Sequence, residues 1–143
     1  MTVTDSGFSF NHGRGLAAAR SAEAMLRALG GGEVQLRFAT LPDSSAPGDA
    51  RLGLAETGSE DAVVSPVVVR NASGANSNAA KTEMLIAASS IEKLVELRSL
   101  GSADALFNAA IAVVHQSRAY RIASVSTEFY GGAPYLYCVM VTE

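Results

Sequence analysis

The sequence predicts an α+β fold: a small antiparallel β-barrel or strongly twisted sheet, with an N-terminal helix and one or two short helices before the last three strands. Residues 110–143 carry three β-branched and aromatic runs, joined by tight connections at 116–118 and 131–134, which is typical of successive strands. Residues 15–29 instead place apolar side chains at helical spacing. Three further strands are predicted by alternating or β-branched runs at 33–38, 62–70 and 82–87.

The N-terminal region predicts a tail followed by one amphipathic helix. Residues 1–11 are polar and contain Gly and Ser, so we expect a flexible tail or an arm that docks on a neighbour. Residues 15–29 are rich in strong helix formers, and Gly30–Gly32 ends the helix. We expect this helix to pack on the barrel rather than to contact a partner directly.

Two segments predict long mobile loops. Residues 40–61 collect Pro, Gly, Ser and Asp, and this loop could hold a short hairpin around Leu52 and Leu54. Residues 71–80 are small and polar, as in a flexible connection. Loops of this length are usually functional or mobile.

The middle of the chain carries one strand breaker and two helix-start signals. Pro66 cannot donate a ladder hydrogen bond, so the strand at 62–70 lies at a sheet edge or contains a break. Ser89 and Glu92 have the spacing of a capping box, which predicts a helix to about residue 99. Ser102 can cap a second short helix.

The apolar side chains of the last two predicted strands indicate which strand faces must be buried against other parts of the protein. Tyr120 and Ile122 share one face while Val125 has the other parity, and this change predicts a bulge or a twist near 123–124. Residues 135–141 are apolar on both faces. Such a strand needs cover on both sides, as in a barrel with a helix against it or at a subunit interface.

Composition narrows the functional class. At 143 residues the chain fits a single domain, 1–143, and its 48% hydrophobic and 17% charged residues leave a surface poor in charge, which suggests burial against partners. The net charge of −3 and the scattered basic residues argue against sequence-independent nucleic-acid binding. The single cysteine predicts no intramolecular disulfide and an intracellular setting, and neither a signal peptide nor a membrane span is predicted.

No set of residues predicts a catalytic, cofactor or metal site. Residues 74–82 lack the glycines of a phosphate-binding loop. His12 and His115, with one cysteine, cannot complete a structural zinc site of His and Cys ligands. Cys138 and His115 could form a nucleophilic pair, but a lone cysteine in a Tyr- and Val-rich strand is usually a small buried apolar residue. We therefore expect a protein that is not an enzyme.

The order of elements resembles that of the small head-to-tail joining proteins of long-tailed bacteriophages and prophages, the connector or neck proteins. In that family an N-terminal helix precedes a β-barrel whose last strands share a recurrent pattern. The matching residues here are Val113, Val114, 116–118, Tyr120, Arg121, Val125, Gly131, Gly132 and 135–141, with 26–38 as the entry from helix to strand.

The resemblance implies a structural, non-enzymatic virion assembly protein without a cofactor. Its copies would form a homo-oligomeric ring between the portal side and the tail side, in the bacterial cytoplasm during assembly and then in the virion. Loops 42–60 and 71–80 would be mobile in the free monomer and would order on assembly. The large apolar residues of the first loop and the last hairpin are the candidate interface: Leu52, Leu54, Phe129, Tyr130, Tyr135 and Tyr137.

Two other functions remain open. One is a small-molecule-binding barrel or uncharacterised enzyme with a polar cavity lined by Tyr120, His115 and Cys138. The other is a tail terminator or a subunit of a contractile apparatus, which would share the ring but face a different partner.

Overall fold

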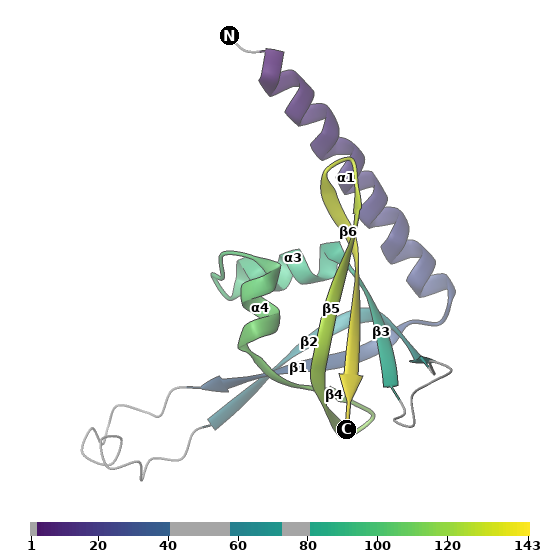
Figure 1. Cartoon of the computed structure of the whole chain (residues 1–143), viewed down its shortest axis with the longest axis vertical. Coiled ribbons are helices and arrows are strands. Elements are labelled where there is room, and N and C mark those ends of the chain that lie inside the picture. Colours follow the sequence, from purple (N-terminus) through teal and green to yellow (C-terminus); the bar gives the residue numbers. More distant parts are fainter. Residues whose placement is uncertain (1–2, 41–57, 73–80) are drawn as a thin grey trace, which may run out of the picture.

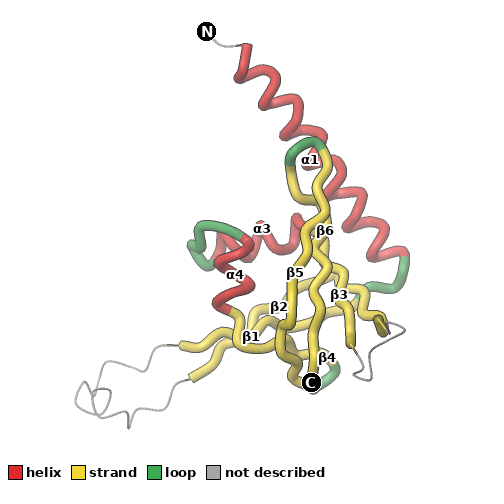
Figure 2. The backbone as a smooth tube through the Cα atoms, viewed as in Figure 1, coloured by secondary structure: helices red, strands yellow, loops and turns green. Residues whose placement is uncertain are grey.

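The protein is a six-stranded antiparallel barrel with helices at one end and along one side. The computed structural model describes residues 3–40, 58–72 and 81–143, which form three helices and six strands (Figures 1 and 2). The helices are α1 (Val3–Ala28), α3 (Ala88–Leu97) and α4 (Ala103–Ala109). The strands are β1 (Gly32–Thr40), β2 (Gly58–Ala72), β3 (Lys81–Ala87), β4 (Ala110–His115), β5 (Arg118–Tyr130) and β6 (Ala133–Thr142). The predicted α+β barrel is confirmed.

Two three-stranded meanders build the barrel. Strands β1, β2 and β3 form the first, and β4, β5 and β6 form the second, with α3 and α4 between them. Pairing of β3 with β6 and of β1 with β4 closes the ring of strands in the order β1-β2-β3-β6-β5-β4. A strand of the barrel has no free edge wherever it is hydrogen-bonded to a neighbouring strand on each side.

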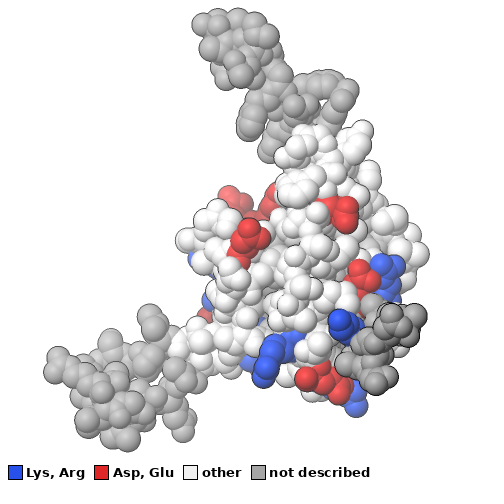
Figure 3. All heavy atoms as spheres, viewed as in Figure 1, with Lys and Arg blue, Asp and Glu red and all other residues white. Residues whose placement is uncertain are grey.

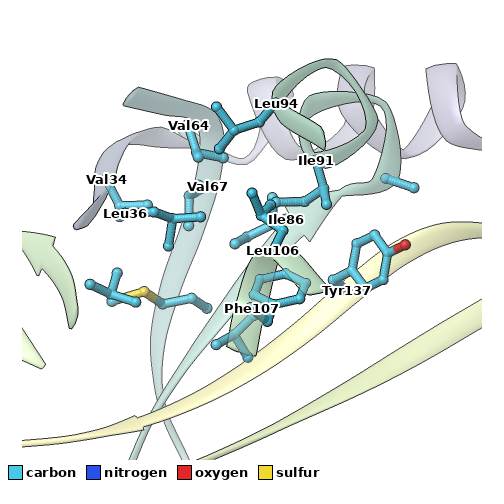
Figure 4. Packing of buried hydrophobic residues seen from close by; sticks show 14 of the residues in the cluster. Val34, Leu36, Val64, Val67, Ile86, Ile91, Leu94, Leu106, Phe107 and Tyr137 are labelled. Atoms are coloured by element: carbon cyan, nitrogen blue, oxygen red, sulfur yellow. The ribbon is translucent and has the colours of Figure 1, made fainter. Parts of the chain in front are cut away.

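Apolar side chains fill the barrel interior. Val34, Leu36 and Phe38 point inward from β1 and are at most 2% exposed, as the alternation of a strand requires. Helices α3 and α4 close one end and add Ile91, Leu94, Leu106 and Phe107 to the same cluster (Figure 4). The Phe107 and Tyr137 rings meet edge to face, with centroids 5.5 Å apart, a favourable aromatic geometry. Among the described residues every fully buried side chain of the core is hydrophobic.

Helix α1 covers the outer face of β3 and β6. Leu26 is 0% exposed and packs with Leu85 and Ala87, flanked by the partly buried Leu136 and Cys138. The inner face of β6 meanwhile supplies Tyr137, Val139 and Val141 to the core. The predicted two-sided cover of the last strand, a helix outside and the barrel inside, is therefore confirmed.

The helix is longer than predicted. It begins at Val3, so residues 3–11 are helical and not the predicted flexible tail. The reason is that no proline interrupts residues 3–28, and isolated glycines such as Gly7 and Gly13 cost a helix only about 1 kcal/mol each relative to alanine. The first half of α1 extends past the tip of the β5–β6 hairpin (Figure 1). At the crossing, Gly15 permits close approach, since a Cβ there would lie 2.3 Å from that of Ala133.

The first predicted loop is shorter than expected. Residues 58–61 belong to β2 and pair with the end of β1, where Arg37 donates a hydrogen bond to Asp61 at 2.9 Å across the ladder. The second predicted loop loses residues 71–72 to the same strand. The predicted hairpin around Leu52 and Leu54 lies outside the described residues.

Pro66 produces a bulge inside the barrel. Gly32 is opposite Val67 and Val34 is opposite Val64, so two residues of β2 face one residue of β1. This irregularity releases the Ser65 carbonyl from the ladder, and the Ser90 hydroxyl donates to it at 2.9 Å. The break, rather than a sheet edge, is the alternative that the structure adopts.

The two helix-start predictions have opposite outcomes. Helix α3 begins one residue after β3 ends, with Ala87 as N-cap and no side-chain cap, so the capping box is wrong. Its Ser89 hydroxyl instead donates to Glu23 of α1 at 3.0 Å. The Ser102 cap is confirmed, because its hydroxyl accepts a hydrogen bond from the Ala105 amide at 3.1 Å.

The predicted bulge in β5 is confirmed. Ile122 is opposite Val141, and Ser124 is opposite Met140. Because Val141 and Met140 are adjacent in β6, Ala123 has no partner in that strand. The extra residue returns Val125 to the inner face, where it joins Tyr120 and Ile122 against the core.

Candidate interaction surface

The strands keep apart the residues that could have formed a nucleophilic pair. His115 is opposite Arg118 and Cys138 is opposite Ser126. These positions differ by 126 − 118 = 8 residues of β5, which is about 25 Å at the rise of a strand. The Cys138 side chain lies under α1 on the outer face, and burial raises the pKa of its thiol.

The cavity considered from the sequence is not formed by its predicted lining. Tyr120 packs against the core inside the barrel, whereas Cys138 lies outside the barrel wall under α1. In residues 15–40, 58–71 and 81–143 no polar or charged residue is buried.

Within the part of the chain that the structure describes, no three His, Cys, Asp or Glu residues come close enough to hold a metal ion. The described helices include none that is both long and apolar enough to cross a membrane.

Five of the nine basic side chains that the structure describes are paired with carboxylates. Arg27, Arg70, Arg98 and Arg118 pair with Glu23, Glu83, Glu60 and Glu143 respectively, and Arg37 pairs with Asp61. The hydrogen bond from Arg37 holds the pKa of Asp61 below its usual range. In these five pairs a carboxylate offsets the positive charge, whereas binding to phosphate backbones uses clustered Lys and Arg.

An exposed apolar surface lies where α1 crosses the last hairpin. A groove of about 270 Å³ runs between them, lined by Ala18, Ser21, Ala22, Met25, Tyr130 and Tyr135. Met25 and Tyr130 are 51% and 56% exposed, and the neighbouring Phe129 is 63% exposed. We call these seven residues the α1–hairpin surface. In Figure 3 the hairpin tip is free of charged atoms, and the charges gather lower, over the barrel and its helices.

The predicted interface residues divide into three groups. Tyr130 and Tyr135 line the groove, and Phe129 is exposed next to Tyr130 in the chain. Tyr135 is also partly buried against the main core cluster. Tyr137 is only 4% exposed and packs on Phe107 in the core, so it cannot contact a partner. Leu52 and Leu54 lie outside the described residues.

The contribution of α1 to this surface was missed from the sequence. Ala18, Ser21 and Met25 lie beside the buried stripe of Ala22 and Leu26. Their spacing of three and four residues is the available signal for a second stripe on the helix. The predicted packing of the helix on the barrel is nevertheless confirmed for its second half.

Comparison of the chain with protein-family models, with curated proteins and with solved structures gave no match.

Proposed function

We propose that this chain is a structural assembly protein whose copies form a ring, and that the ring is a head-to-tail connector of a long-tailed phage or prophage. The observation that carries the self-association is the α1–hairpin surface. Phe129, Tyr130 and Met25 are each more than half exposed, and aromatic side chains are among the types that dominate binding energy at interfaces. The phage assignment is carried by the resemblance of the final strands.

The chemistry of the surface favours a protein partner over a solute. The groove is open and almost wholly apolar, and its polar lining is limited to Ser21 and the Tyr hydroxyls. A small-molecule site usually combines an apolar cavity with several convergent polar groups. Burial of the exposed rings would stabilise an interface by about 25 cal/mol for each Å² of apolar area removed from water.

A closed ring needs a head-to-tail contact between two different surfaces of the chain. The α1–hairpin surface provides one of them. Val63 on β2 and Ile111 at the start of β4 are 58% and 55% exposed, away from α1 on the other wall of the barrel. This wall is the second surface in our proposal.

Sedimentation velocity over a series of protein concentrations tests the ring. We expect the unmodified chain to form a defined oligomer, and Tyr130→Asp to dissociate it. Leu97→Asp is the matched control, because Leu97 is 81% exposed on α3 and lies outside the α1–hairpin surface. Equal effects of the two substitutions, or a chain that stays monomeric alone and with purified portal and tail components, would contradict the proposal.

A further inference from the structure

Strand β5 has one edge that is largely unpaired. Strand β4 pairs with it only at Arg118, Ala119 and Tyr120, whereas β6 pairs with it along nearly its whole length. From Arg121 to Tyr130 no other described residue pairs with the side of β5 that faces away from β6. In Figures 1 and 2 the β5–β6 ribbon accordingly rises away from β4.

Core residues beside this edge are incompletely covered. Tyr120, Ile122 and Val125 point inward and pack against the core, yet all three remain partly exposed. On the same inner face, β6 has a strand on both sides, and its Tyr137 and Val139 are 4% and 1% exposed. Among the described residues, then, no strand covers this edge, and the apolar side chains beside it are partly exposed.

The sequence of this edge does little to prevent strand pairing. Natural edges are usually blocked by lysine, proline or inward-pointing charges. Residues 121–130 contain no Lys, no Pro and no Gly. Their two charged residues are Arg121 near one end and Glu128 near the other, and neither forms an ion pair with another described residue.

We propose that the free edge of β5 pairs with the same edge of a second copy of this chain, antiparallel and about a two-fold axis at Val125. With Val125 opposite the partner's Val125, Ser124 is opposite the partner's Ser126. Ala123 is the bulge and is passed over, as it is in the ladder with β6. Arg121 then lies opposite the partner's Glu128.

This register satisfies two independent requirements. The bulge keeps the faces matched, because Val125 and Ile122 are on the inner face and meet the inner-facing Val125 and Thr127 of the partner, while Arg121 and Glu128 are both exposed outside. The opposite charges meet twice by symmetry, and opposite charges directly across a ladder stabilise pairing. A foreign strand would need to reproduce this pattern, whereas a second copy contains it.

The contact is isologous, so it closes on itself and produces a dimer. The proposed ladder uses residues 121–128 of β5, whereas the α1–hairpin groove is lined by Tyr130 at the end of that strand. The dimer therefore stands whether or not the proposed ring exists. A ring would require an additional head-to-tail contact. The two proposals can therefore fail separately: Tyr130→Asp tests the ring, and changes at Arg121 and Glu128 test the dimer.

Charge exchange is the first test, with the dimer measured by sedimentation equilibrium. We expect Arg121→Glu and Glu128→Arg each to weaken dimerisation by about tenfold, since each variant places like charges together at two symmetric positions. The double variant R121E/E128R should restore dimerisation to near that of the unmodified chain. Both residues are exposed, so folding is preserved. A monomeric unmodified chain, or single variants without effect, would overturn the proposal.

Cross-linking tests the register separately. In a Cys138→Ala background, Val125→Cys should form a disulfide-linked dimer under mild oxidation, because symmetric residues on the axis lie within disulfide reach. Thr127→Cys is the matched control on the same face. Its counterpart would be several residues away along the partner strand, so it should remain uncross-linked. Cross-linking of Thr127→Cys in preference to Val125→Cys would overturn the two-fold register.

Discussion

Replacement of Leu26 by alanine should destabilise the protein by removing a fully buried contact between α1 and the barrel. Leu26 is 0% exposed and is the central contact between α1 and the outer face of the barrel, where it packs on Leu85 and Ala87. Deleting a buried leucine side chain to alanine costs about 2 to 5 kcal/mol, depending on how far the site can collapse. The cluster at Leu26 is small and has a partly buried rim, so partial collapse is possible. We therefore expect a loss of about 3 kcal/mol.

Leu29→Ala is the matched control. The chemical change is the same and lies three residues further along, but Leu29 is 63% exposed. Exposed substitutions away from special contacts usually change stability by less than about 0.5 kcal/mol. Urea unfolding followed by circular dichroism gives both values, and a common slope with denaturant would show that the extent of unfolding is unchanged.

The two variants separate two physical interpretations of α1. If its packing is part of the same cooperative unit as the barrel, Leu26→Ala lowers the urea midpoint of the whole transition. If the helix detaches on its own, the barrel keeps its midpoint and only the helical signal is lost early. Equal stability of Leu26→Ala and Leu29→Ala would refute the role of Leu26 as the anchor of α1.

Three further outcomes follow from the described contacts. Cys138 should react with a thiol reagent more slowly than free cysteine at neutral pH, because burial raises the pKa of its thiol, and Leu26→Ala should speed the reaction by uncovering it. Hydrogen bonds from Arg27 and Ser89 help to lower the pKa of Glu23 below its usual 4.5. The ionised Glu23 therefore stabilises the fold fully above about that pH, and this stabilisation is lost as the pH falls through the folded-state pKa. In urea unfolding at a series of pH values, Glu23→Gln should remove the part of the decrease in stability at acid pH that Glu23 causes. Ser102→Ala should cost about 1 kcal/mol in the same unfolding assay, because the Ala105 amide loses its cap.

Alternation along a strand indicates which residues share a face, but not which residues of one apolar face are buried in the core and which remain exposed. The two-sided apolar pattern of β6 correctly predicted cover on both sides. It could not separate Tyr135 from Tyr137 as interface and core residues, because that choice depends on where α3 and α4 close the barrel. Packing of Phe107 on Tyr137 decides it, and Phe107 lies in α4, thirty residues earlier in the sequence.

Local signals succeeded where no distant contact competed with them. Ser102 caps α4 because its hydroxyl has no stronger partner among the described residues. Ser89 has the same chemistry, yet β3 runs directly into α3, the helix begins earlier, and Glu23 of α1 accepts its hydrogen bond. The bulge at Ala123 was predictable because Val125 must return to the core face. The unpaired edge of β5 was not, since the number of neighbours of a strand is a property of the assembled sheet.

The unpaired edge also links folding to association. Tyr120, Ile122 and Val125 are core residues that remain partly exposed in one copy of the chain, so pairing of two β5 strands would complete a core as well as an interface. A partner that binds only the folded state raises its stability by mass action. The unfolding midpoint of the unmodified chain should therefore rise with protein concentration, and R121E should shift this dependence to about tenfold higher concentration while leaving the midpoint at high dilution unchanged. A midpoint independent of concentration in both proteins would show that the exposed edge is tolerated by the monomer and has no partner among its own copies.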